Sequence, residues 1–570
     1  MPSHASWPVS RPGKRASDLL SSSLPPDFLE DPLVPRENAK KPWYPCASAP
    51  FTPMFFLLAL VVLGGLLARF WRARRNNAVL SLRGPEAPSF VFGNMLQLQG
   101  SATYGEHEYK WLEEFGTVYP VKGCLGQTRL MISDPEALKY LLHNQSVSWA
   151  STQQKSVKML FGYDSLFISR GTRHAHLRRI MNPWFSASSV RTMLPIMRDA
   201  AQRLVENWES QGFFGKTVDI SPTLHTASMD VISETLLETP MHGLEGKTSL
   251  SQIQNVLIDN LSGAGNVGQL MEAVIPYIPD WLFKILLRLP IPGLGTLKDY
   301  HRVTDDLTMK LLAAKRAAGE TSDRSFVGKL ASANDFSRPW TGIKEKDIPV
   351  HVRSMLMAGD RTTGDTLSWA MYQIARLPEF QASLRKEARA AQMSGEEIDY
   401  DKLPLLNAFL YEILRYYPAL PLADRIAVED FVLPLSKPVI TKSGASITQL
   451  PIQKGQDIYL ALASYHRMKS IWGEDAHEFR PSRWMEAEPP GNGLGMGQHG
   501  ALLAFLAGHG ICIGYRLAML NIQVLVSTLV AKFAFALPED DSVRPSFVIT
   551  LVPKTGDGKS ALPVVVSMAD

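Results

Sequence analysis

A glycine-rich loop carries one cysteine and leads directly into a helical pattern. The loop runs from Phe505 to Gly514 and reads FLAGHGICIG, with Cys512 near its end. Apolar residues recur with helical spacing from Tyr515 onward. Cys512 is therefore expected at a helix N-terminus, where the helix dipole and free backbone N–H groups favour a thiolate. Three readings follow: a thiolate bound to a metal, a buried structural cysteine, or a nucleophile with His509 as its base.

Composition excludes several classes of protein. The chain has 570 residues and a net charge of +4, so it lacks the basic excess that nucleic-acid binding requires. Its three cysteines, Cys46, Cys124 and Cys512, are far apart, which argues against a disulfide framework and indicates a reducing compartment. Their spacing also excludes a C-x-x-C zinc site.

The N-terminal part of the chain predicts a tail followed by a membrane anchor. Residues 1–50 are rich in Pro and Ser without apolar periodicity, which predicts a disordered tail. The uncharged run MFFLLALVVLGGLLA, extended to residues 51–71, reaches the roughly 20 residues that a transmembrane helix needs. Four arginines between 69 and 75 follow, and such clusters mark the cytoplasmic end of a span. The sequence thus predicts a single-pass protein whose downstream part is cytosolic.

The remainder predicts one large helical body. Residues 72–94 combine arginines with Pro and Gly, which predicts a hinge, and residues 95–570 show no further break. Asp134 precedes a proline and an apolar-periodic stretch, which is typical of a helix N-terminus. Apolar spacing predicts further helices at 191–209, 222–238, 301–318, 345–376 and 378–391.

Strands are predicted in only two places. Residues 118–122 and 128–133 flank a Gly-containing turn and predict a hairpin. Residues 546–552 and 562–567 predict two strands joined by a turn at 556–558. The expected fold class is therefore mainly α with small β-sheets (α+β).

Three helical segments carry notable polar residues. Glu412 and Arg415 share one helix face; alone they make a common surface ion pair, but their apolar, Tyr-rich flanks predict burial. The segment Ala358–Thr363 places a glycine and threonines, which are poor helix formers, in mid-helix. His174 and Arg178 lie four residues apart on a basic helix face. Taken alone, the last two are most simply solvated polar faces.

Together and in order, these segments resemble the cytochrome P450 family from about residue 82 to the end. The cysteine loop is similar to the family's haem-ligand loop, F-x-x-G-x-R-x-C-x-G. The Glu–Arg pair and Phe479–Trp484 are similar to its E-x-x-R and F-x-P-x-R-W segments. Ala358–Thr363 is similar to A-G-x-[D/E]-T-[T/S], and Gly171–Phe185 to a helix that contacts the haem propionates.

The resemblance implies the cytochrome P450 fold, a single large haem domain behind the anchor, and haem b as cofactor. It implies Cys512 as the axial ligand of the haem iron, held in a loop with Phe505 and Gly514. It further implies contacts to the propionates from His174, Arg178 and Arg425, with His509 as the nearest substitute donor for a missing arginine.

The resemblance also assigns roles to residues remote from the loop. Glu412, Arg415 and Arg483 would form a buried structural triad that braces the haem core. Thr362 would be the catalytic threonine that hydrogen-bonds the reacting oxygen, and Asp360 is the nearest acid to it.

Two positions depart from the family pattern. Gly510 stands where the cysteine loop has an arginine, and Arg361 stands where the threonine segment has an acid. Asp360 lies one residue, or about 100° of helix, from the acid's position, so it does not simply replace it. The proton relay next to Thr362 is therefore the open question of this sequence.

The expected function is a haem-thiolate monooxygenase that oxidises a lipophilic small molecule, such as a terpenoid or another secondary metabolite, with O2. The anchored type implies a NADPH–cytochrome P450 reductase, with cytochrome b5 as a second candidate partner, at the endoplasmic reticulum membrane. The residues leave two alternatives: a reductase-independent haem enzyme that rearranges or dehydrates an oxygenated substrate, and a non-catalytic haem binder. The reductase-independent enzyme is suggested by Arg361, and the non-catalytic haem binder is suggested by Gly510 and Arg361 together.

Overall fold

The computed structural model describes most of the chain beyond the predicted anchor. The described residues are 64–65, 78–238, 241–245, 250, 253–254, 256–257, 265–286, 294–317, 325–332, 342–491, 493–497 and 500–570. The predicted tail and, apart from Gly64 and Gly65, the predicted span lie outside them. Within these ranges, no helix has the length and apolarity that crossing a bilayer requires.

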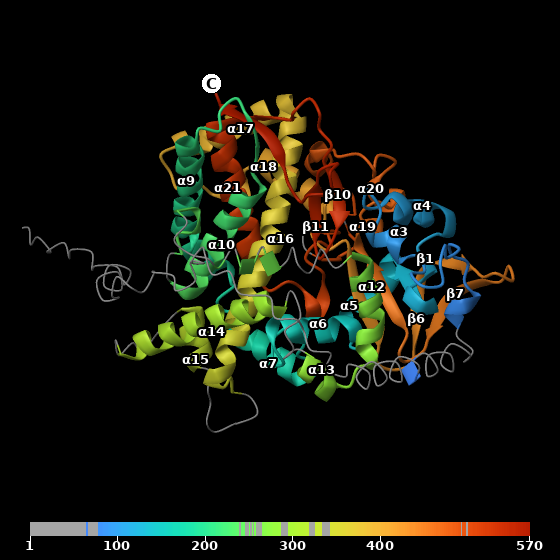
Figure 1. Cartoon of the computed structure of the whole chain (residues 1–570). Helices are drawn as coiled ribbons and strands as arrows, with labels where there is room; N and C mark the ends of the chain where they lie inside the picture. The colour runs from blue at the N-terminus through green and yellow to red at the C-terminus, as the bar shows by residue number, and fades with distance from the viewer. Residues whose placement is uncertain are drawn as a thin grey trace, which may run out of the picture.

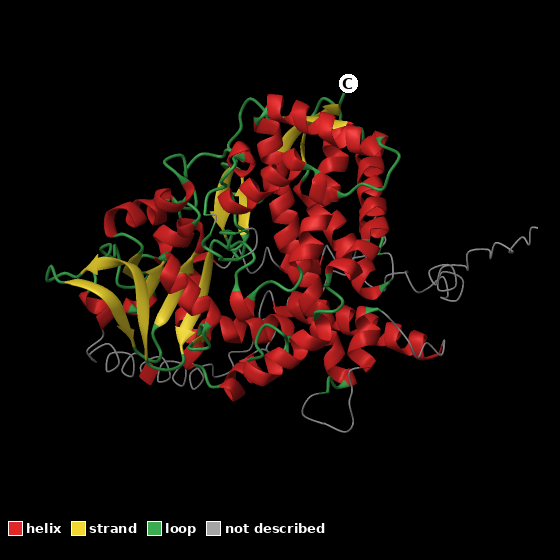
Figure 2. Ribbon diagram, turned by 180° about the vertical axis from the view of Figure 1, so that it is seen from behind, coloured by secondary structure: helices red, strands yellow, loops and turns green. Residues whose placement is uncertain are grey.

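Four long helices pack together in the helical half of the molecule (Figures 1 and 2). They are α9 (Leu194–Gln211), α10 (Ser221–Leu237), α16 (Ile348–Arg376) and α21 (Tyr515–Lys532). The central helix α16 contacts both α10 and α21, and α9 contacts the same two helices. Because α16 is covered on several sides, most of its side chains are buried, including polar ones.

The other helices surround this group. Their bounds are α3 (Met95–Gln99), α4 (Glu106–Phe115), α5 (Pro135–His143), α6 (Ser151–Phe161), α7 (Gly171–Met181), α8 (Ala187–Thr192), α12 (Gly265–Val274), α13 (Asp280–Leu286), α14 (Leu294–Ala317), α15 (Phe326–Ser332), α17 (Pro378–Met393), α18 (Pro404–Tyr416), α19 (Leu462–Tyr465) and α20 (Lys469–Trp472). Short 3-10 turns lie between them, among them η8 (Pro481–Met485) and η9 (Gly508–Gly510).

The predicted helices are confirmed, with shifted ends. The Asp134 carboxylate accepts a hydrogen bond from the backbone N–H of Ala137 at 3.0 Å, so it caps α5 as expected. The predicted helix at 191–209 is divided between α8 and α9, because Pro195 occupies the first turn of a new helix and has no N–H to continue the preceding one.

Most of the strands lie at the opposite end of the molecule, while a smaller sheet lies beside the long helices near the C-terminus (Figure 2). The largest sheet has five strands in the order β1-β2-β8-β5-β3, with only β2 and β8 parallel. The strands are β1 (Val118–Lys122), β2 (Thr128–Ile132), β3 (Val147–Trp149), β4 (Thr217–Asp219), β5 (Leu422–Ala427), β6 (Phe431–Ile440), β7 (Ser446–Ile452), β8 (Asp457–Ala461), β9 (Phe533–Ala536), β10 (Arg544–Phe547), β11 (Leu551–Lys554) and β12 (Pro563–Met568).

The β1–β2 hairpin confirms the first strand prediction. The prediction of two strands near the C-terminus is wrong in detail. Residues 546–552 are not one strand: β10 and β11 pair antiparallel, and the backbone N–H of Val548 bonds the Thr550 carbonyl in the turn between them. β12 pairs with β4 and β9 instead of β11. A short apolar run does not reveal such a turn, because nothing in its pattern interrupts the alternation.

The described part of the predicted hinge packs on the body. Leu82 is fully buried and forms a bridge with Thr441. The Asn94 side chain accepts a hydrogen bond from the backbone N–H of Lys122 at 2.8 Å. The packed structure therefore includes the Pro- and Gly-rich stretch.

Candidate active site

The cysteine loop folds back on itself just before α21. The backbone N–H of Cys512 donates to the Phe505 carbonyl at 2.9 Å, and that of Ile511 donates to the Gly508 carbonyl at 3.3 Å. The Phe505 ring lies 6.1 Å from that of Tyr515, the first residue of α21. These contacts tie both ends of the loop together and hold Cys512 at the N-terminal end of α21.

The loop also packs tightly against the end of α5 at Gly508. This residue has a φ of +61°, and a Cβ added there would lie 2.2 Å from the carbonyl oxygen of Leu142. Gly510 has an ordinary φ, and a Cβ there would meet no atom within 4 Å. The position at which the family pattern has an arginine is therefore sterically open, whereas Gly508 has no substitute.

We expect Gly508→Ala to destabilise the loop, because a non-glycine residue at positive φ costs about 1–3 kcal/mol even before the clash with Leu142 is counted. The substitution should lower the midpoint of thermal unfolding and speed haem loss to a haem-accepting protein. Gly510→Ala is the matched control and should change stability by less than about 0.5 kcal/mol. Equal effects of the two substitutions would contradict this account of the loop.

Cys512 is an exposed residue, yet protein surrounds its thiol. Desolvation by the neighbouring protein raises the pKa of the thiol. The Gly514 backbone N–H and the Arg178 guanidinium oppose that rise in pKa. A side chain with these properties can be reached by a ligand, and an added positive charge would convert it to the thiolate.

Basic side chains from α7 and η9 lie around the cysteine. The Arg178 Nη1 donates to the Ile511 carbonyl at 2.9 Å. Burial lowers the pKa of His174, and the neighbouring Arg178 and His509 lower it further. Among the described residues no carboxylate lies within ion-pair distance of Arg178. The cluster thus offers hydrogen-bond donors to an anion that the described part of the chain does not itself supply.

Arg425 has different neighbours. Its guanidinium lies 4.9 Å from the centre of the Trp149 ring, and its Nη1 donates to the Asp424 carbonyl at 2.8 Å. Burial lowers the pKa of Arg425 to about 10, against the opposing effect of Asp424. No hydrogen bond or ion pair among the described residues joins it to the cysteine loop, so its contact with a propionate stays a prediction.

The threonine segment lies in the middle of α16. The Thr362 hydroxyl donates to the Ala358 carbonyl at 2.8 Å, and the side chain is half-buried. The Asp360 carboxylate is buried and accepts a hydrogen bond from the Gln254 amide at 2.6 Å. Arg361 pairs with Asp365 one turn further along, at 3.3 Å. Asp360 is therefore engaged away from the position of the family acid, and its catalytic assignment stays untested.

Asp365 and its partner His225 are the polar residues near this segment that sequence reasoning missed. The spacing of Arg361 and Asp365, four residues apart, is a signal for an ion pair on one helix face. His225 lies 140 positions away in the sequence, and no local pattern connects it with α16.

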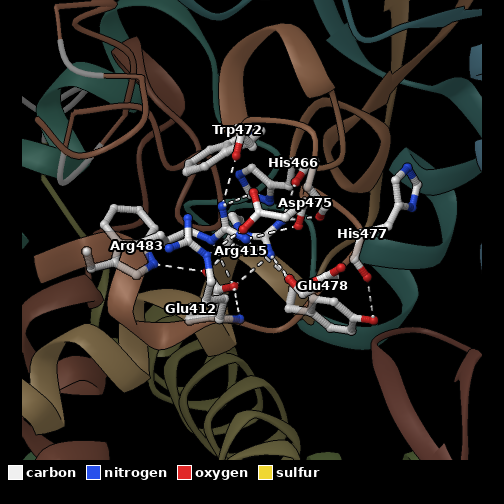
Figure 3. Close-up of polar contacts among 12 residues, drawn as sticks. Glu412, Arg415, His466, Trp472, Asp475, His477, Glu478 and Arg483 are labelled. Carbon is white, nitrogen blue, oxygen red and sulfur yellow. Dashed lines mark hydrogen bonds and ion pairs between the residues drawn. The ribbon is translucent and has the colours of Figure 1, made fainter. Parts of the chain in front are cut away.

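Glu412, Arg415 and Arg483 meet in a buried cluster (Figure 3). Arg415 donates to Glu412 through Nε at 2.8 Å and Nη2 at 2.7 Å, and Arg483 donates through Nε at 3.0 Å. The backbone N–H of Arg480 and the Trp484 indole N–H complete five donors to one carboxylate.

The cluster also holds loop segments in place. The Arg415 guanidinium donates to the carbonyls of His466, Ala476 and Glu478. Burial alone would raise the pKa of Glu412, but the hydrogen bonds and charges of the arginines lower it. The three residues thus join α18 to the segment that leads into η8, which is a structural arrangement.

The residues around Cys512 fit haem b. One accessible thiol at a helix N-terminus can serve as an axial iron ligand. The Arg178 guanidinium has no carboxylate partner among the described residues, and with His174 and His509 beside it, it suits the propionates, because guanidinium and carboxylate pair well. The close approach at Gly508 fixes the loop that presents the thiol.

Known proteins similar to this chain agree with this reading. The family model described as Cytochrome P450 matches residues 82–557. Cytochrome P450 monooxygenase claQ of Ampulloclitocybe clavipes is 27% identical over 506 residues, which cover 86% of this chain and 92% of the relative. Cytochrome P450 monooxygenase 205 of Postia placenta is 28% identical over 515 residues, covering 85% and 92%. Since the family model spans most of its length, the chain belongs to the cytochrome P450 family, whose members are monooxygenases that bind haem b through a cysteine thiolate.

Proposed function

We propose that this enzyme oxidises a lipophilic small molecule, a terpenoid or a similar secondary metabolite, with Cys512 as the axial ligand of its haem iron. The observation that carries the proposal is the exposed residue Cys512 at the start of α21, beside a basic cluster for which the described residues supply no carboxylate partner. When bound, haem supplies the activation of O2 with electrons from a redox partner.

The side chains around the thiol have separate tasks in this proposal. Arg178, His174 and His509 would bind the propionates and so fix the orientation of the cofactor. The Thr362 hydroxyl lies on α16, where it donates a hydrogen bond to the Ala358 carbonyl. A local change of acceptor would allow it to hold a proton near the reacting atoms.

The partners and the location follow from the N-terminal sequence. The apolar run at 51–71 with the arginines after it supports a single-pass anchor in the endoplasmic reticulum membrane and a cytosolic catalytic domain. An anchored enzyme of this kind would take its electrons from NADPH–cytochrome P450 reductase, with cytochrome b5 as an additional donor. A membrane location also gives access to lipophilic substrates.

Expression of the full chain in membranes with a reductase tests the proposal. We expect a carbon monoxide difference spectrum of the thiolate type, and products from a lipophilic panel only when NADPH and O2 are both present. A monooxygenase assignment would be wrong if product formed without either.

A second candidate is a reductase-independent enzyme that rearranges or dehydrates an oxygenated substrate. Arg361 at the position of the family acid favours it, because the usual proton relay is then altered. Anaerobic conversion of an organic peroxide without NADPH would support this second candidate, whereas strict dependence on NADPH and O2 excludes it.

A further inference from the structure

A histidine from α10 lies between two carboxylates of α16. The His225 Nε2 is 3.1 Å from Asp365 Oδ1, and the Nδ1 is 3.8 Å from Asp360 Oδ1. The side chains of His225, Asp360 and Asp365 are only 4%, 2% and 2% exposed, so water screens their charges from one another very little.

Each carboxylate has further partners. Asp365 Oδ2 lies 3.3 Å from Arg361 Nε and accepts a hydrogen bond from the Thr550 hydroxyl at 2.5 Å. Asp360 Oδ2 accepts from the Gln254 amide at 2.6 Å, and Gln254 in turn accepts from the Tyr300 hydroxyl at 2.9 Å. The two acids are thus anchored by elements other than α16.

The geometry favours a proton on both ring nitrogens of His225. Nε2 lies within hydrogen-bond distance of Asp365 Oδ1, Nδ1 lies within ion-pair distance of Asp360 Oδ1, and a neutral imidazole carries a proton on only one nitrogen. His225 Nδ1 and Asp360 Oδ1 have no hydrogen-bond partner among the described residues, so the charge of an imidazolium is what can compensate this carboxylate oxygen. As an imidazolium, His225 joins Arg361 to balance two buried carboxylates with two cations; as a neutral ring it would leave one buried negative charge uncompensated.

The electrostatic environment agrees with the imidazolium form. Burial alone would lower the pKa of His225, but Asp360 and Asp365 raise it to about 9, with Arg361 opposing. These three charged groups all belong to α16, and Gln254, Tyr300 and Thr550 add only neutral polar contacts to the acids.

The backbone of α16 is shaped to admit the ring. A Cβ added to Gly364 would lie 2.2 Å from His225 Nδ1, so the imidazole packs directly on the helix backbone there. The two acids that it bridges flank the Arg361–Thr362 pair on the same helix. The position of His225 is therefore coupled to the segment that departs from the family pattern.

We propose that His225 is a positioning residue for the reaction: its imidazolium compensates the charge of Asp360 so that Asp365 stays paired with Arg361, and this pair holds Thr362 and its helix turn in the working arrangement. The role rests on the proposed monooxygenase function. Arg361 has taken the position of an acid, and the compensating acid lies one turn along at Asp365, where His225 and Thr550 secure it.

Isosteric substitutions test the charge balance. The assay uses the full-length enzyme coupled to its reductase and measures the fraction of NADPH electrons that is recovered in product. We expect His225→Gln to lower this fraction by about tenfold, which lies within the range of interaction energies between residues of one ion network. Adding Asp360→Asn should restore that fraction, because it removes the uncompensated charge and leaves the Asp365–Arg361 pair intact. Adding Asp365→Asn should not restore it. Equal rescue by both, or unchanged recovery in His225→Gln alone, would overturn the proposal.

A second readout does not depend on turnover. The pKa of His225 is raised from 6.5 to about 9, so its ion pairs stabilise the fold fully below pH 6.5 and lose that effect as pH rises through 9. The thermal midpoint of the haem-loaded wild type should therefore fall toward that of His225→Gln between pH 6.5 and 9. A constant difference across that range would overturn the proposal, and the wild-type profile alone should show the fall if the variant does not fold.

The two proposals can fail separately. If the wild type formed no NADPH-dependent product but showed this pH profile, the proposed function would be wrong while the ion cluster would stand.

Discussion

Cys512→Ala should abolish both the thiolate-type carbon monoxide difference spectrum and all NADPH-dependent turnover. The loop contains no second sulfur atom. The other cysteine of the described region, Cys124, is buried, and its thiol lies 3.9 Å from the Phe92 carbonyl oxygen. The thiolate supplies electron density to the iron, and alanine has no atom that can replace it. Spectra of the dithionite-reduced membranes before and after carbon monoxide measure the effect.

Cys124→Ala is the matched control, since it removes the same atoms from a packed site on the β-sheet side of the molecule. It should keep the spectrum and lose only the stability that a small core cavity costs, about 1 kcal/mol. A thiolate-type spectrum retained by Cys512→Ala would assign the ligand to another residue and would remove the basis of the proposed function.

The sequence predicted those features that depend on local pattern. Helices such as α10 and α16 follow from apolar spacing, and the cap at Asp134 follows from its place before a proline. The ends of elements were less well predicted, because a turn such as that around Val548 is determined by a hydrogen bond and not by hydrophobicity. The identity of the cysteine loop was also readable, since glycines at fixed spacing reflect close backbone approaches such as the one at Gly508.

Contacts between distant segments could not be predicted in this way. Nothing near His225 in the sequence indicates that it meets two acids of α16, and Gln254 reaches Asp360 across 106 positions. Even for the Glu412 cluster, the pattern named the charged residues but not the backbone carbonyls that the Arg415 guanidinium binds. Tertiary packing determines these partners, and a single sequence contains no record of it.

Glu412→Ala should be the most damaging substitution outside the cysteine loop. It leaves the guanidinium groups of Arg415 and Arg483, both fully buried, without their carboxylate, and removing one partner of a buried ion pair costs about 3–5 kcal/mol. We expect a low yield of folded protein, little bound haem and a thermal midpoint well below that of the wild type. Haem absorbance per protein and thermal unfolding measure these losses.

The pH dependence gives a separate check on the same carboxylate. The arginines hold the pKa of Glu412 below its ordinary value, so its ion pairs stabilise the fold above that ordinary value and cease to do so as pH falls through the lowered one. The stability gap between wild type and Glu412→Gln should therefore be constant near neutral pH and narrow only under acid conditions. A gap that closed near neutral pH would show that the carboxylate is not held in its charged form by the arginines.

A surface pair provides the contrast that separates burial from mere charge pairing. Glu474 pairs with Lys469 at 3.6 Å, but its side chain is 91% exposed. Glu474→Ala should change the unfolding free energy by less than about 1 kcal/mol, because water screens and replaces such a contact. If Glu412→Ala were as mild as Glu474→Ala, the buried cluster would not be what joins α18 to the segment before the cysteine loop, and the haem-core bracing assigned to it would be wrong.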